Sequence, residues 1–301
     1  MEKRYCLDHR KLSVIGIPIT TKCNLNCRHC LRQVWHEYVN KDWYISVTQA
    51  TEIAEKISGK TEYVNLSAGY GETLLHDEAV EITNIFRNNG IKTIIYSNGT
   101  NDIMDKLERL KTDIFVYSTD IYHHADINCF KNHVEYFINY ANRVKYAFAD
   151  KFIISCVIEP DLQSREVIEY LVNICKNDER IYLEFHWRMF YEEHLNCSDK
   201  NEMFIRWLAD LPVNKTISIP ALDRKVKNEC NDIFDSLYFD YNGNVRKCCV
   251  FMESDAECNI YKMEIDEIIK STLMNKWQME WRDRGEFVFC RNCPIGHGFL
   301  G

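Results

Sequence analysis

The chain has 301 residues, of which 46% are hydrophobic and 27% charged, a composition ordinary for a globular protein with a substantial core. Its formal net charge of -8 disfavours nucleic-acid binding, because phosphate contacts require a basic surface. The first residues are too charged for a signal peptide, and no apolar run approaches the roughly 20 residues that a membrane-spanning helix needs. We therefore predict a cytoplasmic protein with neither nucleic acid nor a membrane as its partner.

Cysteine is unusually frequent, with 14 residues in the chain. Because the cytosol keeps thiols reduced, a disulfide framework is not expected there. The cysteine content instead predicts that the protein binds a metal ion or a cluster.

Short apolar runs alternate with helical patterns through the first two thirds of the chain. The strand candidates are continuous apolar runs, typical of parallel strands covered on both faces, and they span residues 12–18, 63–66, 93–96, 114–117, 152–157 and 181–185. Helical periodicity is clearest in residues 50–57 and 167–175, and Gly59 and Gly90 are expected to end the first helices. Six β–α units in series predict a parallel sheet that curls into a partial barrel, with ligands beyond the carboxyl ends of its strands.

The pattern changes after about residue 188. A helical stretch near residues 201–211 precedes a loop that contains Pro212 and Pro220. Two β runs on either side of residues 242–243 predict a hairpin, since Asn-Gly is a strong turn signal. A helix is expected to follow, carrying Ile265, Ile268, Ile269 and Leu273.

Three cysteines follow the first strand candidate: Cys23, Cys27 and Cys30, with the spacing Cys-x3-Cys-x2-Cys. An iron–sulfur cluster normally takes four thiolates, so a motif of three leaves one iron open to a group that is not protein. Zinc is the alternative, because it prefers four nitrogen or sulfur ligands and His29 or His36 could supply the fourth.

Four motifs, beginning with this triplet, resemble those of the radical S-adenosylmethionine (SAM) superfamily over about the first 190 residues. Residues 70–76 resemble the Gly-Gly-Glu-Pro segment that holds the methionine amino group. Residues 97–100 follow the third strand as in many members, and residues 118–120 end the fourth strand, where relatives use Ser and Asp near the ribose. The sequence departs from the family in two places, because Tyr70 and Thr73 replace Gly and Pro, and His29 stands where an aromatic residue is common.

The resemblance implies a [4Fe–4S] cluster on the three cysteines, with SAM chelated to the fourth iron. It also implies contacts to SAM from the strand-end residues His29, Tyr70, Gly71, Glu72, Ser97, Asn98, Ser118 and Asp120. The expected chemistry is one-electron cleavage of SAM to methionine and a 5′-deoxyadenosyl radical, with an external low-potential donor such as flavodoxin or ferredoxin. The barrel would orient the reactants and exclude water.

A second set of cysteines lies towards the end of the chain, at Cys230, Cys248, Cys290 and Cys293. With Gly243 its spacing resembles the Twitch extension, the one-cluster form of the SPASM domain of radical SAM enzymes, and it implies an auxiliary [4Fe–4S] cluster. A structural zinc ribbon is the alternative. The fold class expected is therefore α/β, a partial (β/α)6 barrel with a small α+β Twitch-type extension. Its three parts are the radical SAM barrel (1–190), a helical linker (191–229) and the auxiliary-cluster domain (230–301).

Cys249 adjoins a predicted cluster ligand, although the set of four is complete without it. Because neighbours on a strand face opposite ways, we expect its thiol to point away from that cluster, where it could donate a hydrogen atom to a substrate radical. The resemblance extends to radical SAM epimerases, in which such donors occur; the alternative is a small buried hydrophobe. Cys258 is a weaker candidate. Glu184 and Arg188, at the sixth strand, are candidates to anchor a charged substrate group or to take a proton.

The favoured hypothesis is a radical SAM epimerase of an amino-sugar, an aminocyclitol or a peptide, with Cys249 as the hydrogen donor. The acidic balance and the few residues ahead of the barrel favour the amino-sugar or aminocyclitol. The second hypothesis is an oxidative enzyme, a dehydrogenase or a peptide-crosslinking enzyme, whose auxiliary cluster accepts electrons. Outside catalysis, the hypothesis is a zinc-stabilised binding protein.

Overall fold

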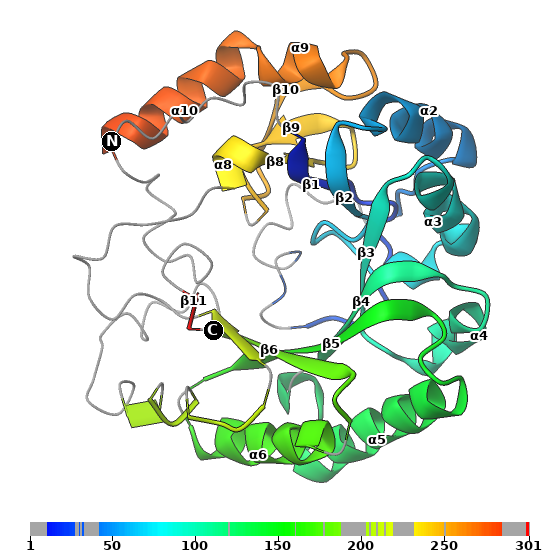
Figure 1. Cartoon of the computed structure of the whole chain (residues 1–301), viewed down its shortest axis with the longest axis vertical. Helices are drawn as coiled ribbons and strands as arrows, with labels where there is room; N and C mark the ends of the chain where they lie inside the picture. Colours follow the sequence, from blue (N-terminus) through cyan, green and yellow to red (C-terminus); the bar gives the residue numbers. More distant parts are fainter. Residues whose placement is uncertain are drawn as a thin grey trace.

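The computed structural model has one curved sheet, with helices along its outer face (Figure 1). The structure describes residues 11–27, 30, 32, 42–119, 121–159, 161–176, 178–187, 203–204, 206–208, 210–213, 215–218, 232–249, 251–284 and 299–300. The 11 strands of the sheet are arranged in the order β10-β9-β8-β1-β2-β3-β4-β5-β6-β7-β11. The chain thus has the α/β fold with a mostly parallel sheet that the sequence predicts.

Strands β1 to β7 run parallel to one another, and β8 joins them parallel to β1. Strands β9, β10 and β11 are antiparallel to their neighbours. The bounds are β1 (Leu12–Gly16), β2 (Thr61–Asn65), β3 (Lys92–Ser97), β4 (Thr112–Thr119), β5 (Ala149–Ile158), β6 (Ile181–Trp187), β7 (Lys215–Ser218), β8 (Ser236–Phe239), β9 (Asn244–Arg246), β10 (Ser254–Asn259) and β11 (Phe299–Leu300). All six predicted strands are therefore confirmed, as β1 to β6.

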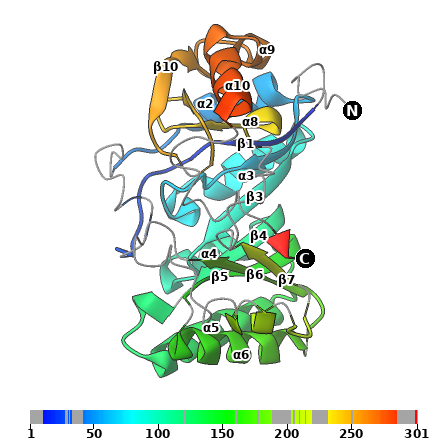
Figure 2. The ribbon, with the colours of Figure 1, turned by 90° about the vertical axis from the view of Figure 1, so that its left-hand side faces the viewer.

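Helices follow the parallel strands and cover the convex side of the sheet (Figures 1 and 2). Helices α5 and α6 lie beside β5 and β6, and α9 and α10 lie beyond β8. The bounds are α2 (Val47–Ile57), η2 (Thr73–Leu75), α3 (Ala79–Asn88), η3 (Asn101–Ile103), α4 (Met104–Leu107), η4 (Ile121–His123), α5 (Ile127–Arg143), α6 (Leu162–Lys176), α8 (Asp232–Asp235), α9 (Ile265–Ile269) and α10 (Thr272–Arg284). Among the residues that the structure describes, no helix is both long and apolar enough to cross a membrane.

Local sequence explains where α2 begins and ends. Ser46 accepts a hydrogen bond from the backbone N–H of Gln49, and the Gln49 side chain accepts one from the N–H of Ser46, which forms a capping box. The apolar positions of the helix are buried, and Gly59 follows with φ of +71°, a conformation that glycine adopts without strain. Helix α3 is likewise followed by Gly90 at φ +73°. The periodicity and the glycines thus predict both helices correctly.

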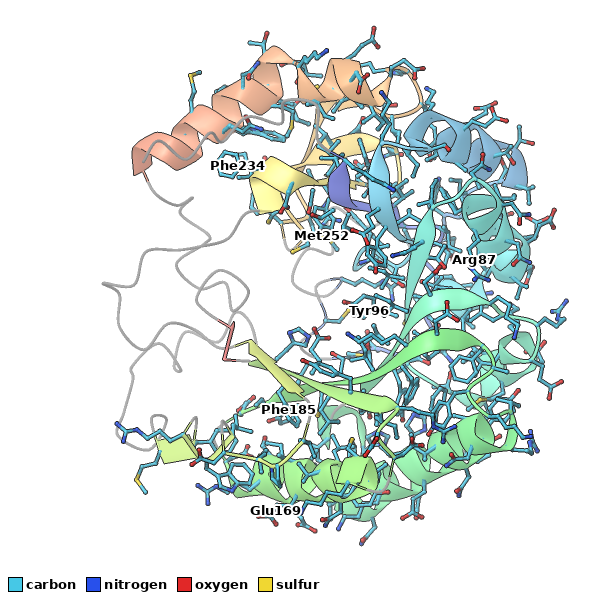
Figure 3. All side chains as sticks on the ribbon, viewed as in Figure 1. Arg87, Tyr96, Glu169, Phe185, Phe234 and Met252 are labelled. Atoms are coloured by element: carbon cyan, nitrogen blue, oxygen red, sulfur yellow. The ribbon has the colours of Figure 1, made fainter. Side chains whose placement is uncertain are left out.

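The two faces of the sheet can be assigned from aromatic contacts. Phe115 and Tyr117 of β4 stack on Phe137 of α5, with ring centroids 6.0 and 4.2 Å apart, so these positions face the helices. Since side chains alternate along a strand, Val116 and Ser118 face the opposite, concave side. Phe185 of β6 likewise points towards α6, whereas Tyr96 of β3 points into the concave side (Figure 3). The concave face is therefore the one on which the barrel presents functional groups.

The predictions for the last third of the chain need three corrections. The predicted loop between the two prolines contains β7, which pairs parallel with β6. The predicted single helix is two helices, because the chain leaves α9 at Lys270 and the Ser271 hydroxyl accepts the N–H of Met274 at the start of α10. The hairpin of β8 and β9 is confirmed, but it extends the barrel sheet along β1 and does not form a sheet of its own. Of the predicted helix 201–211, residues 203–204 and 206–208 are helical.

Candidate functional site

The cysteine loop leaves the carboxyl end of β1 and is closed by contacts between its two ends. The hydroxyl of Thr20 and the backbone N–H of Thr21 donate hydrogen bonds to the Trp43 carbonyl at 3.1 and 2.9 Å. The Trp43 N–H in turn donates to the Thr21 hydroxyl at 3.0 Å, and Thr20 and Tyr44 form an antiparallel bridge. Both threonines are buried. The ends of the loop are therefore anchored independently of any ligand that its cysteines bind.

Cys23, Cys27 and Cys30 are partly exposed on this loop, and the N–H of Cys30 donates to the Cys27 carbonyl at 3.1 Å. No three acidic, histidine or cysteine side chains among the described residues are grouped to hold a single metal ion. A [4Fe–4S] cluster makes a different demand, because it places each of the three thiolates on a different iron. His29 and Asp120, predicted to contact SAM, lie outside the described residues.

The surroundings of Cys23 act on its thiol in opposite directions. Burial raises the pKa of the Cys23 thiol and Glu72 adds to this effect, whereas Arg32 acts in the opposite direction. The Nε–H of Arg32 is buried and has no hydrogen-bond acceptor among the residues that the structure describes. Buried donors normally have an acceptor. The thiolates of a bound cluster would supply one for this N–H. The donor set therefore fits the group that the motif implies.

Gly71 lies directly against the beginning of the cysteine loop. A Cβ atom at this position would lie 2.6 Å from the carbonyl oxygen of Thr20 and 2.7 Å from that of Lys22. The next residue, Glu72, donates its N–H to the Lys22 carbonyl at 2.8 Å. The close approach requires glycine, and it places the backbone of residues 70–72 beside the residue that precedes Cys23.

Glu72 joins the loops that follow β2 and β3. Its carboxylate accepts the N–H of Leu74 at 3.1 Å and the N–H of Asn98 at 2.7 Å, and only 3% of the residue is exposed. Burial raises the pKa of Glu72 to about 7, although its hydrogen bonds oppose that shift. Each carboxylate oxygen thus accepts one backbone N–H, and the side chain holds the segments after β2 and β3 together.

Asn98 completes a ring of hydrogen bonds between the three motifs. Its side-chain amide donates to Asn24 Oδ1 at 2.8 Å, and the Asn24 amide donates to the Thr100 hydroxyl and to Asp102 at 2.7 and 2.8 Å. The neighbouring Ser97 is buried and accepts the N–H of Gly99 at 3.3 Å. The cysteine loop, the segment after β2 and the segment after β3 therefore form one hydrogen-bonded unit.

Thr73 and Tyr70, which stand where the family motif has Pro and Gly, both have structural roles. The Thr73 hydroxyl lies 2.6 Å from the hydroxyl of Ser67, which also accepts the N–H of Tyr96 at 2.8 Å. Tyr70 is completely buried, and its ring lies 4.9 Å from the guanidinium carbon of Arg246. Arg246 is a residue that sequence reasoning missed, since its only signal was its position two residues before Cys248.

The concave face carries a polar row across three neighbouring strands. Ser118 of β4 pairs in register with Ser155 of β5, which pairs with Glu184 of β6. Burial raises the pKa of Tyr96, which lies on the same face, and Glu184 and Cys249 add to this effect. Glu184 and Cys249 each therefore lie near Tyr96.

Glu184 contacts His186, whose Nε2 lies 3.0 Å from the carboxylate, and only 20% of the Glu184 side chain is exposed. Burial acts to raise the pKa of Glu184, but the contacts with His186 and Ser155 outweigh it, and the pKa is lowered. A carboxylate with a low pKa is a weak base, which suits it better to hold a positive charge than to take a proton. Arg188, the companion candidate, lies outside the described residues.

Cys248 and Cys249 lie in a bend after β9, not on a strand. The expected position of both cysteines on the strand is therefore wrong, and the alternation argument does not apply to them, since it holds only for extended backbone. Cys248 Sγ accepts the N–H of Phe251 at 3.4 Å, and the Cys249 carbonyl accepts Nη2 of Arg246 at 2.8 Å. Cys258 is completely buried in the hydrophobic core. The other three predicted ligands of this set, Cys230, Cys290 and Cys293, lie outside the described residues.

Residues 17–157 match the family model described as the Radical SAM superfamily, and this stretch contains the cysteine triplet and all three strand-end motifs. No curated protein matches the chain in sequence. The match supports assignment to the radical SAM superfamily, which implies a [4Fe–4S] cluster and SAM, and a domain of this kind supports an enzyme. Radical SAM enzymes also need a reductant.

Three solved structures resemble the fold. SuiB of Streptococcus suis bound to the precursor peptide SuiA has a TM-score of 0.65 and 14% identity, over 95% of this chain and 70% of SuiB. BtrN in complex with AdoMet and 2-DOIA has a TM-score of 0.52 and 14% identity, over 94% of this chain and 93% of BtrN. The enzyme anSMEcpe with bound AdoMet has a TM-score of 0.58 and 15% identity, over 96% and 86% of the two chains. At such low identity the likeness concerns the fold.

Proposed function

We propose that the chain is a radical SAM epimerase that inverts a carbon centre of an amino-sugar, an aminocyclitol or a peptide, with Cys249 as the hydrogen-atom donor. Cys23, Cys27 and Cys30 would hold the SAM-binding [4Fe–4S] cluster. Cys230, Cys248, Cys290 and Cys293 would hold an auxiliary cluster in a C-terminal domain over residues 230–301. The first assignment accords with the family match, and the second depends on the cysteine spacing.

SAM would bind along the strand ends, in contact with His29, Tyr70, Gly71, Glu72, Ser97, Asn98, Ser118 and Asp120. The hydrogen-bonded unit described above supports this proposal, because it fixes the segments after β2 and β3 to the cysteine loop. When bound, the reduced cluster and SAM supply a 5′-deoxyadenosyl radical that removes a hydrogen atom from the substrate. The chain's own contribution is to position these groups and to limit the access of water.

The observation that carries the proposal for Cys249 is that Arg246 binds the carbonyls of Cys249 and Ala68 at 2.8 and 3.1 Å, which places the cysteine bend beside the segment after β2. In the proposed step the S–H bond of Cys249 breaks and its hydrogen forms a C–H bond on the opposite face of the substrate radical. One electron from the external low-potential donor, passed through the auxiliary cluster, and one proton would then restore the thiol. The substrate would thus be isomerised without net oxidation, while SAM is cleaved reductively to methionine and 5′-deoxyadenosine. Glu184 would hold a positively charged group of the substrate, and Arg188 would hold a negatively charged one.

The first experiment is anaerobic reconstitution with iron and sulfide. We expect about eight irons per chain for two [4Fe–4S] clusters, and about four in the triple variant Cys23→Ala, Cys27→Ala, Cys30→Ala. A colourless protein that binds zinc alone would eliminate the enzyme proposal and favour the zinc-stabilised binding protein.

The second experiment is turnover of amino-sugar and peptide substrates in deuterium oxide. We expect one deuterium at the inverted carbon, and Cys249→Ala should form 5′-deoxyadenosine without releasing the epimer. Cys258→Ala is the matched control, because that thiol is buried in the core and should leave deuterium incorporation unchanged. A product that has lost two electrons, formed equally well by Cys249→Ala, would instead support the oxidative alternative.

A further inference from the structure

Arg246 is a buried cation that binds three backbone carbonyls. Two of them lie in the segment after β9 and one lies in the loop after β2. Only 1% of the residue is exposed. Its Nε donates to the Phe251 carbonyl at 2.8 Å, its Nη2 to the Cys249 carbonyl at 2.8 Å and its Nη1 to the Ala68 carbonyl at 3.1 Å. Among the described residues no carboxylate forms an ion pair with it. The guanidinium therefore uses its fork of donors to connect the bend after β9 with the loop after β2.

The ring of Tyr70 provides the other half of this contact. It lies below the Arg246 guanidinium, with 4.9 Å between the guanidinium carbon and the ring centroid. Tyr70 also meets the ring of Tyr241 edge to face at 6.0 Å, and it packs with Ala68 and Met252 in a small cluster apart from the main core. We call these five residues the clasp. Met252 points from the β8 side of the barrel towards the concave side, in the position expected for such a contact (Figure 3).

The clasp gives a physical reason for the tyrosine that replaces the family's glycine. A glycine at position 70 would provide neither an aromatic face for the cation nor packing for Met252 and Tyr241. The Tyr70 hydroxyl has no hydrogen-bond partner among the described residues, so the ring is the useful part of the side chain. Position 71 follows directly, and its backbone lies against the residues that precede Cys23.

We propose that Arg246 and Tyr70 form the link through which the C-terminal cysteine bend positions the SAM-binding segment, so that SAM affinity depends on Arg246. This inference rests on the proposed function, because it takes residues 70–72 as part of the SAM site. Arg246 is a positioning residue, acting on SAM through the backbone that follows Ala68. The same guanidinium holds the Cys249 carbonyl, so one side chain sets the spacing between the proposed hydrogen donor and the SAM segment.

The test measures the dissociation constant of SAM on anaerobically reconstituted protein, read from the change that SAM causes in the EPR spectrum of the reduced N-terminal cluster. We expect Arg246→Met to weaken SAM binding by about tenfold or more, because three carbonyls lose charge-assisted hydrogen bonds and each 1.4 kcal/mol is a factor of ten. Arg246→Lys should restore only part of the affinity, since an ammonium group keeps the charge but lacks the planar fork.

Tyr70 offers a matched pair of variants on the other side of the link. Tyr70→Phe should keep more of the SAM affinity than Tyr70→Leu, because it keeps the ring that lies against the Arg246 guanidinium. Tyr70→Leu should weaken binding, and combining it with Arg246→Met should add little, as expected for two residues in one interaction. Lys247→Met is the control for charge, because the Lys247 ammonium lies over the rings of Phe251 and Trp277 and not over Tyr70.

The outcomes separate this inference from the proposed function. If the wild type takes up no cluster or shows no response to SAM, the proposed function fails. If the wild type responds and Arg246→Met has the same SAM affinity, the clasp does not position the SAM segment. Should Arg246→Met fail to fold, the comparison of Tyr70→Leu with Tyr70→Phe decides, and equal affinities in that pair would overturn the inference.

Discussion

Gly71→Ala tests whether the segment after β2 must lie in contact with the cysteine loop. The added methyl carbon would lie 2.6 Å from the Thr20 carbonyl oxygen, 2.7 Å from that of Lys22 and 2.9 Å from the carbonyl carbon of Thr21. All three neighbours are backbone atoms, so no side chain can rotate away. The two segments would have to separate, and the hydrogen bond from Glu72 N–H to the Lys22 carbonyl would lengthen from 2.8 Å.

The magnitude follows from the cost of inserting a methyl group into a packed contact, which is about 1–3 kcal/mol. Backbone strain does not contribute, because Gly71 does not have a positive φ. If the methyl group fitted, alanine would instead stabilise the chain by about 0.4–1 kcal/mol, since it restricts the unfolded state. The sign of the change in the free energy of unfolding therefore shows whether Gly71 lies in a packed contact or next to open space.

The assay is the free energy of unfolding from urea titration of the apoprotein, with SAM affinity of the reconstituted protein as a second measurement. Gly90→Ala is the control, because its added methyl group meets nothing within 4 Å and its cost comes only from the positive φ of +73°. We expect Gly71→Ala to lose stability and SAM affinity together, and Gly90→Ala to lose stability alone. A stabilised Gly71→Ala protein with unchanged SAM binding would refute the packing argument.

Three further predictions concern the site and the core. Burial raises the pKa of Glu72 from 4.5 to about 7, so its contribution to stability is complete at low pH and is lost as the pH rises through 7. Between pH 5 and 8 the free energy of unfolding of the wild type should fall by roughly 2–3 kcal/mol more than that of Glu72→Gln, and an equal fall in both would contradict this. Asn24→Ala should cost less than about 1 kcal/mol of stability yet weaken SAM binding severalfold, because its hydrogen bonds tie the cysteine loop to residues 98–102; unchanged affinity by EPR titration would count against that tether. Phe137→Ala should cost about 3–5 kcal/mol in urea unfolding, because the ring is buried among the aromatic residues of β4 and β5, while the half-exposed neighbour Tyr136→Ala should stay within about 0.5 kcal/mol.

The order of strands and helices in the barrel was predictable from the sequence, because its signals are local. Apolar runs such as 114–117 and 152–157 predict buried strands, and this prediction does not depend on which strands lie next to them in the sheet. Gly59 and Gly90 end helices through their own backbone freedom. The break between α9 and α10 was not predicted, because the apolar spacing continues across it and only the Ser271 cap interrupts the helix.

The candidate site was predicted in part for the same reason. The cysteine triplet and the segments after β2 and β3 are short motifs whose spacing is visible along the chain. The role of the Glu72 side chain was not visible, because its partner Asn98 is 26 residues away. The placement of Cys248 and Cys249 on a strand was inferred wrongly, because β9 ends at Arg246.

By itself, the sequence determined the composition of the barrel, the position of the cysteine triplet and the motifs at the strand ends. Only the tertiary structure decided which of these groups touch. Register between strands aligned Ser118, Ser155 and Glu184 on one face, and the pairing of β8 with β1 carried Arg246 to Tyr70. The physical reason is that a contact such as that between Arg246 and Ala68, 178 positions apart, depends on how the whole sheet closes, a property that no local pattern contains.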